Sequence, residues 1–428
     1  MKWLTLSLFG ALLSWAIYSI APFVSRTITV FGLFRRYPEG TTTTDETLQA
    51  IPDTTHCEDL HYHAPSGTLF TACEDNLEGR HKWFPPLANF DDPEVGSKGL
   101  GSIHVIDPKT MKSQRLKFDN FNGPFITHGI DVIPDKDRPE GEAVYIFAVN
   151  HVPEVQASGA KGPSARSQLE VFYHIIGTSS VKHLRSIWHP LIRTPNDVVA
   201  LSPTSLYVTN DHFYREHGIM RTIEDMYIKS DWSDIVHIQL DSLKAPSADA
   251  GVTARIALAG LHNTNGIGHG RTEDEILISS CTSGVLNIAQ VPSDPSTGNL
   301  TVVEAIEIDH IADNPSYFAD PYASAVDDRS GFLEAGVSRA ADLLHTMRDP
   351  NAKDPVMVTY LRPKRPEEGG GWEKRVLLDD DGARLRSASA AVLVAIDPAS
   401  EPNGGSRKAW LFATGFLSKN VIAVKVDL

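Results

Sequence analysis

The stretch Asp234–Leu240 (DIVHIQL) carries the pattern that decides the fold of this chain. Val236, Ile238 and Leu240 recur at every second position, as in a β-strand that buries one face, and the stretch ends in a turn. Equivalent short strands recur mostly 50 to 70 residues apart, at Ser102–Asp107, Leu169–Tyr173, Val285–Ala289, Val356–Tyr360 and Val421–Val426. Six strands at this spacing predict an all-β protein, a β-propeller with six blades.

Length and composition are compatible with this fold. The chain has 428 residues, and its 31 glycines and 27 prolines make it rich in turns. Two or three separate domains would also suit this length. A lipocalin-like barrel would need a shorter chain, and an α/β fold would need helices between the strands. Only residues 215–230 and 332–348 have a helical pattern.

Two further features concern the arrangement of the blades. Apolar runs between the repeated strands, such as Ala143–Val149 and Glu275–Ile278, are predicted to be the inner strands. The last repeated strand reaches the end of the sequence. In a closed propeller the two ends of the chain commonly share one blade, which removes the open edge of the sheet. We therefore expect the first strand of the domain to pair with the last.

The N-terminal segment predicts entry into the secretory pathway. No charged residue lies between Trp3 and Val24, a length that is about sufficient to span a bilayer. We predict an uncleaved signal-anchor over residues 1–24, which would attach the protein to a membrane. The alternative is a signal peptide removed after Ala21, although Pro22 would hinder cleavage there. Residues 25–55 are predicted to be a linker, and residues 56–428 the propeller domain.

Net charge and cysteine content narrow the possible partners and compartments. The formal net charge of -15 argues against nucleic acid as a partner and is compatible with cation binding.

Cys57 and Cys73 are placed almost equally far from a predicted turn at Pro65–Gly67. They are therefore either a disulfide across a hairpin or two buried thiols. Cys281 is predicted to be a buried free thiol. Asn299 begins a glycosylation acceptor sequence, Asn-Leu-Thr.

Carboxylate and amide side chains cluster at the edges of predicted strands. These are Glu58-Asp59, Asn196-Asp197, Asn265 and Asp313-Asn314. Such oxygens, gathered from distant loops, are the ligands that Ca²⁺ requires. Neighbouring residues in a strand point to opposite sides, so that a pair could serve two ions at different depths. The simpler alternative is that these residues form turns, which suits Asn265-Gly266 best.

The segments that contain these clusters resemble the serum paraoxonase/arylesterase family. The matching stretches occur in the family's order over residues 57–428: Glu58–Leu60, Phe125–Ile130, Val149–His151, Pro195–Val199, Thr209–His212, Asn265–Ile267 and Asp313-Asn314. Each stretch alone is short and unspecific. Seven in register, on a chain whose strands independently predict six blades, make the resemblance specific.

The resemblance implies two calcium ions near the propeller axis. A catalytic ion would be held by Glu58, Asn196, Asn265, Asp313 and Asn314. A deeper structural ion would be held by Asp59, Asp197 and the backbone carbonyl of Ile130. The resemblance also implies that His128 acts as general base towards a water molecule and that His151 orients it. His212, in the same set of stretches, is either a pocket wall or part of a turn.

The chain also departs from the family. The family joins a cysteine near its start to one in its last strand, but Val424–Leu428 contains none. The family's apolar helix after the Thr-Asn-Asp-His stretch attaches it to lipid surfaces. Here that region contains charged residues, which argues against docking to lipoproteins: Arg215, Glu216, Arg221, Glu224, Asp225 and Lys229. Residues 315–355 and 363–373 also differ, so the pocket walls do not transfer.

The sequence therefore predicts a calcium-dependent hydrolase of lactones and aryl esters. One alternative is a gluconolactonase-like propeller hydrolase, which would lack the pair His128 and His151. Another is a non-catalytic propeller that binds a ligand and uses calcium only for stability. A serine esterase is disfavoured because no Gly-x-Ser-x-Gly sequence occurs, and a zinc peptidase because no His-Glu-x-x-His sequence occurs.

Overall fold

The computed structural model describes residues 2–42, 47–154, 165–227, 229–293, 298–365, 369–400 and 407–428. Within these residues, six sheets of four or five strands form a closed ring. The first strands of the sheets contact one another in the order β2, β9, β13, β17, β21 and β25, and β25 contacts β2 again. This is the six-bladed β-propeller that the repeated strands predict.

Strand bounds are given blade by blade, from the axis outward. The first blade contains β2 (Cys57–His63), β3 (Thr68–Cys73), β6 (Ser102–Asp107) and β7 (Lys112–Arg115). The second contains β9 (Thr127–Pro134), β10 (Ala143–Pro153), β11 (Ala165–Ile175), β12 (Ser180–Ile187) and β8 (Lys117–Asp119). The third contains β13 (Pro195–Ser202), β14 (Ser205–Asn210), β15 (Ser233–Leu240) and β16 (Val252–Leu261). The fourth blade contains β17 (Thr264–His269), β18 (Glu275–Ser280), β19 (Val285–Gln290) and β20 (Thr301–Glu307). The fifth contains β21 (Ser316–Phe318), β22 (Gly331–Val337), β23 (Val356–Pro363) and β24 (Trp372–Asp380). The sixth contains β25 (Ala388–Ala395), β26 (Lys408–Gly415), β27 (Val421–Asp427) and β1 (Gln49–Ile51).

The predicted strand repeat corresponds to one position in every blade. The six repeated strands are β6, β11, β15, β19, β23 and β27, each of them third from the axis. The runs predicted to be inner strands lie inside the repeated strands but are not the innermost ones: Ala143–Val149 lies in β10 and Glu275–Ile278 in β18, both second from the axis. A second strand is covered on both faces by neighbouring blades, so it is apolar throughout. The first strands carry polar residues instead, because they line the axis.

Apolar side chains fill the interfaces between neighbouring blades. The buried residues form six main clusters, one in each interface of the ring. Between the second and third blades, for example, Val149 and Val171 pack with Val198 and Val236. The core is therefore divided around the ring, and the axis is free to hold polar groups.

The two ends of the domain share the sixth blade, as expected. β1 pairs with β27 in antiparallel register, with Ile51 opposite Val421. The stretch expected to be a linker thus contains a strand of the propeller. The seam is a hydrogen-bonded ladder, consistent with the lack of a cysteine in the last strand.

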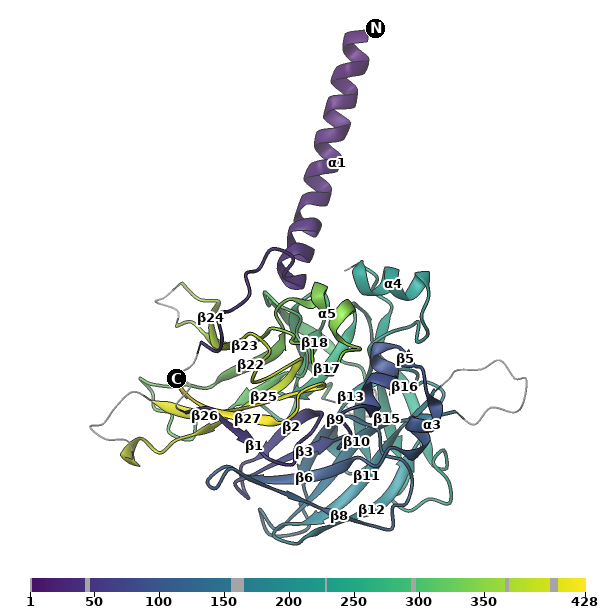
Figure 1. Ribbon diagram of the computed structural model, residues 1–428, viewed down its shortest axis with the longest axis vertical. Coiled ribbons are helices and arrows are strands. Elements are labelled where there is room, and N and C mark those ends of the chain that lie inside the picture. The colour runs from purple at the N-terminus through teal and green to yellow at the C-terminus, as the bar shows by residue number, and fades with distance from the viewer. Residues whose placement is uncertain are drawn as a thin grey trace.

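Helices lie outside the ring. α1 (Lys2–Phe31) projects from the face of the propeller where α4 (Ile219–Met226) and α5 (Ala340–Thr346) lie (Figure 1). The prediction of a helix over residues 332–348 was wrong in its first half, which forms β22. Short helical segments α2 (Gly79–Lys82), η2 (Pro85–Leu87) and α3 (Pro93–Lys98) and the hairpin β4 (Trp83–Phe84) and β5 (Asn89–Phe90) follow β3, and η4 (Pro398–Ser400) follows β25.

The C-terminal part of α1 is attached to the propeller. Val30 and Phe31 pack with Val337 and Ala340, and the Arg26 guanidinium donates to the Ser283 carbonyl at 3.1 Å. The side chains of residues 2–13, 16 and 17 are outside the described part of the structure, and so is most of the predicted signal-anchor. Among the described residues, we find no helix that combines the length and the hydropathy needed to cross a membrane.

Cys57 and Cys73 form a disulfide, which settles the alternative left open by the sequence. They stand opposite each other in the β2–β3 ladder. Cys281 is buried and free, as predicted, and burial raises the pKa of its thiol well above the usual value.

Replacing both Cys57 and Cys73 by serine is expected to lower the free energy of unfolding by about 2–4 kcal/mol, because the bridge closes a 16-residue loop in the unfolded chain. Urea denaturation of both proteins, with and without a reducing agent, would measure this. The difference should vanish under reducing conditions. A difference that persists there would mean that the serines disturb packing and that the bridge itself contributes little.

Candidate active site and metal centre

A β-bulge near the start of the first strand aims the candidate residues at the axis. In the β2–β3 ladder the register shifts by one residue between Cys57 and Leu60, so that Glu58 and Asp59 occupy the bulge. The same shift occurs at four other first strands, at His128-Gly129, Asn196-Asp197, Asn265-Gly266 and Ser389-Ala390. A bulge places an extra residue on one strand and re-aims its side chains. Five blades therefore present polar residues at the same level of the ring.

Contacts confirm that these segments meet. Asn314 Nδ2 donates to Glu58 Oε1 at 2.8 Å, although the residues are 256 positions apart. A Cβ atom at Gly266 would lie 2.5 Å from Asn314 Oδ1, so the bulge in β17 lies directly against this residue. His128 Nε2 lies 3.9 Å from Glu58 Oε1. The structure thus brings together Glu58, Asn314, Asn265-Gly266 and His128.

The five residues predicted to hold the catalytic ion share one property. Each has a buried side-chain oxygen without a hydrogen-bond partner: Glu58 Oε2, Asn196 Oδ1, Asn265 Oδ1, Asp313 Oδ1 and Asn314 Oδ1. A buried polar atom without a partner is costly, so its persistence in a set calls for a ligand. Oxygens from carboxylates and amides are the chemistry of a hard cation. These residues therefore fit a calcium ion.

Charge at this cluster also calls for a cation. Burial, followed by the neighbouring Asp59, raises the pKa of Glu58 to about 8. Burial and then Glu58 raise the pKa of Asp313 well above its usual value. Carboxylates so close together cannot all be ionised without a positive partner. Among the described residues, no group of three His, Cys, Asp or Glu side chains is placed to hold a metal. The five candidate ligands of the catalytic ion are not a group of that kind, because three of them are asparagines.

The residues predicted to hold the deeper ion do not show this property. Asp59 Oδ1 accepts from the Leu60 N–H at 2.7 Å, and Oδ2 accepts from the Ile130 N–H at 3.0 Å. Asp197 accepts from the Val198 and Ile267 N–H groups, at 2.7 and 2.8 Å. All four carboxylate oxygens are thus hydrogen-bonded. These bonds connect β2 to β9 and β13 to β17.

His128 and His151 form a buried pair, as the resemblance implies. His128 Nδ1 lies 3.2 Å from His151 Nε2, and His151 Nδ1 lies 2.8 Å from Ser167 Oγ. Burial, with smaller contributions from His151 and Arg80, lowers the pKa of His128 well below its usual value. Burial also lowers the pKa of His151, to about 3. Both imidazoles are therefore neutral near pH 7, the state in which a ring nitrogen accepts a proton.

Several residues around this pair were not found from the sequence. Phe84 makes T-shaped contacts with both imidazoles, and Trp83 Nε1 donates to the His151 carbonyl at 2.8 Å. Arg80 is fully buried, pairs with Glu74 at 2.9 Å and stacks on Phe84. They belong to the short segments after β3, which have no periodic pattern. Their sequence therefore contains no signal of this role.

His212 is held between two carboxylates. Its Nδ1 lies 3.0 Å from Asp211 Oδ1, and its Nε2 lies 2.7 Å from Asp225 Oδ1. Asn196 Nδ2 donates to Asp211 Oδ2 at 3.5 Å, which connects this group to the candidate cation ligands. Of the two alternatives from the sequence, these contacts favour a structural role for His212.

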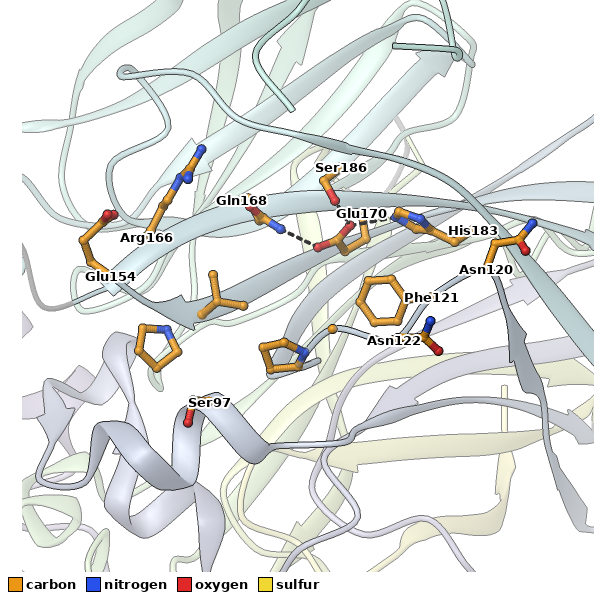
Figure 2. Close-up of a pocket in the computed structure, with 14 residues that line it drawn as sticks. Ser97, Asn120, Phe121, Asn122, Glu154, Arg166, Gln168, Glu170, His183 and Ser186 are labelled. Atoms are coloured by element: carbon orange, nitrogen blue, oxygen red, sulfur yellow. Dashed lines mark hydrogen bonds and ion pairs between the residues drawn. The ribbon is translucent and has the colours of Figure 1, made fainter. Parts of the chain in front are cut away.

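A cavity of about 540 Å³ lies beside the strand that carries His151, but it contains none of the candidate residues. In Figure 2 the Glu170 carboxylate lies between Gln168 and His183. Glu170 also accepts from Ser186 Oγ at 2.6 Å and from Asn150 Nδ2 at 2.9 Å. Its oxygens are fully used within the protein, so Glu170 joins β10, β11 and β12.

Fold and site define a six-bladed propeller whose candidate catalytic groups lie at its axis. The family model described as Arylesterase matches residues 95–325, more than half of the chain. The chain belongs to the arylesterase family, which includes the paraoxonases. This confirms the resemblance noted from the sequence.

Curated relatives are similar over part of their length. Serum paraoxonase/arylesterase 2 of Gallus gallus is 29% identical over 238 residues, covering 55% of this chain and 58% of the relative. Serum paraoxonase/arylesterase 2 of Homo sapiens is 24% identical, covering 59% of this chain and 60% of the relative. Serum paraoxonase/lactonase 3 of Oryctolagus cuniculus is 23% identical, covering 72% and 74%. The match thus spans about three fifths of the first two relatives.

Solved structures give a weaker likeness. A luciferin-regenerating enzyme has a TM-score of 0.43 at 10% identity, with 89% of this chain and 95% of that chain covered. An aldose sugar dehydrogenase of Streptomyces coelicolor, solved in its PQQ-bound form, has a TM-score of 0.42 at 12% identity, with 92% and 99% covered. These values are too low to carry an argument.

Proposed function

We propose that this protein is a calcium-dependent hydrolase of lactones and aryl esters. Family membership supports an ester hydrolase. The observation that carries the calcium requirement is the set of five buried oxygens without partners, on Glu58, Asn196, Asn265, Asp313 and Asn314. When bound there, a calcium ion supplies a positive charge that polarises the substrate carbonyl and stabilises the negative charge that develops on its oxygen.

His128 is the proposed general base. Its neutral ring accepts a proton from the attacking water at Nε2, the nitrogen that faces Glu58, because Nδ1 is directed to His151. His151 is a positioning residue: its contacts with His128 and with Ser167 fix the orientation of both rings. Phe84 excludes water from one side of the pair. A gluconolactonase-like enzyme is disfavoured by this pair.

We place the protein in the secretory pathway. The disulfide between Cys57 and Cys73 and the serum relatives support this. The uncharged segment from Trp3 to Val24 would act as a signal-anchor. Asn299 is exposed and so accessible to glycosylation.

Of the six charged residues that argue against docking to lipoproteins, Arg221 and Glu224 on α4 are buried, whereas Glu216 and Lys229 are exposed. The outer side of α4 is apolar instead, with Ile219, Ile223 and Met226 exposed. α4 lies beside the base of α1, where Phe23 contacts Tyr227 (Figure 1). We therefore propose that this face of the protein lies on a lipid surface.

Chelation tests the proposed function. Hydrolysis of phenyl acetate and of a δ-lactone by the full chain should fall to the background rate with a calcium chelator and return when calcium is added back. A hydrolysis rate that is unchanged by the chelator would contradict the calcium requirement. No activity on either ester, combined with a calcium-dependent melting temperature, would favour the non-catalytic propeller.

A further inference from the structure

The family resemblance implies two calcium ions, but the two sets of residues differ in this structure. The upper set contains five buried oxygens without partners. In the deeper set each carboxylate oxygen accepts at least one hydrogen bond, as described above. The deeper carboxylates therefore lack the oxygens without partners that distinguish the upper set.

His61 lies where the deeper ligands converge. Its Nε2 lies 3.1 Å from Asp59 Oδ2, the oxygen that also accepts from the Ile130 N–H. His61 therefore contacts Asp59, one of the three ligands that the resemblance assigns to the second ion.

The other ring nitrogen of His61, Nδ1, connects Asp59 and His61 to three more strands. His61 Nδ1 lies 3.6 Å from Asp131 Oδ1, and Asp131 is fully buried on β9. Asp131 Oδ2 accepts from the Ala200 N–H of β13 at 2.7 Å and lies 3.0 Å from His269 Nε2 of β17. Asp59, His61, Asp131 and His269 thus form one axial network. It joins the first strands of four blades, β2, β9, β13 and β17.

We propose that this chain binds a single calcium ion, in the upper set, and that the axial network replaces the second ion. A structural ion at the axis would connect neighbouring blades through shared oxygen ligands. The axial network makes the same connection with hydrogen bonds and one ion-pair contact, between His61 and Asp131. This inference rests on the proposed function for the upper ion but makes a separate statement about the deeper position.

The test is a count of bound calcium on the full chain, by native mass spectrometry and by equilibrium dialysis. We expect one ion per chain. Two ions would overturn the proposal, whereas no ion at all would overturn the calcium requirement of the proposed function. The two failures are therefore distinguishable. This count uses the unmodified protein, so it does not depend on whether a variant folds.

Two matched variants locate the ion. Asp313→Asn and Asp59→Asn make the same chemical change at buried residues of the two sets. Asp313→Asn keeps a side-chain oxygen but removes a negative charge from the upper set, so it should weaken calcium binding by more than about 100-fold, whereas Asp59→Asn should weaken it by no more than about tenfold. The reverse order would place the ion in the deeper set and overturn the proposal.

His61→Ala probes the axial network directly. It should lower the melting temperature by the same amount with and without calcium, because the network is independent of the upper ion. A decrease seen only in the presence of calcium would mean that His61 acts through a bound ion, which would contradict the replacement.

Discussion

Hydrolysis of phenyl acetate by His128→Gln is expected to be slower by about 10²–10⁴-fold, the usual contribution of a general base. Glutamine retains a polar group of similar size, but its amide cannot take a proton from water. The loss should appear in kcat, with a small change in KM, because His128 is proposed to act on the water and not to hold the substrate. Steady-state kinetics at saturating calcium would measure both values.

A matched control separates this effect from damage to the fold. His174→Gln replaces another buried histidine of the same blade, at the opposite end of β11 from Ser167. It should keep most of the activity. The calcium-dependent melting temperature should be retained in His128→Gln. Unchanged activity in His128→Gln would exclude His128 as the base.

Calcium is expected to stabilise the protein by about 2.7 kcal/mol at a concentration 100 times its dissociation constant, since it binds only the folded chain. Asp313→Asn should lose this increment. Without calcium the same variant should be at least as stable as the unmodified protein, because it removes one of several crowded buried carboxylates. Thermal melts of both proteins would measure this. The variant should be at least as stable as the unmodified protein with chelator and less stable with calcium.

The calcium increment is also expected to grow with pH. The pKa of Glu58 is raised from 4.5 to about 8 in the folded chain without metal. Its contribution to stability is therefore complete below pH 4.5 and is lost as pH rises through 8. Calcium binds the ionised carboxylate and restores that loss, so the increment should be larger at pH 8.5 than at pH 6. An increment that is independent of pH would contradict the role of Glu58 as a ligand.

The sequence was sufficient to predict the number of blades. The third strand of each blade has one face in an interface and alternates clearly, as Asp234–Leu240 does. The first strands lack this signal because they line the axis with polar residues. The strand Gly331–Val337 was mistaken for a helix, since its sequence GFLEAGV has no alternation. Pairing with β23 overrides this local preference.

The candidate ligands could be named from short motifs, but their arrangement could not be predicted. The bulges that turn Asn196-Asp197 and Asn265-Gly266 towards the axis are defined by pairing with a neighbouring strand, and no residue type marks them. Likewise, the sequence does not indicate the role of His61, because its partner Asp131 lies 70 positions away. Long-range contacts of this kind become visible only when the ring is closed.

The pairing of β1 with β27 has a consequence for how the protein is made. During synthesis β1 emerges before every other strand of the ring, and β27 emerges after them. The ring therefore cannot close until translation of the domain is complete. Until then, β1 has no partner, and the outer edge of the unfinished sixth blade is open to pairing with other chains. A nascent chain of this design is exposed to such pairing for longer than one whose neighbouring strands are also neighbours in sequence.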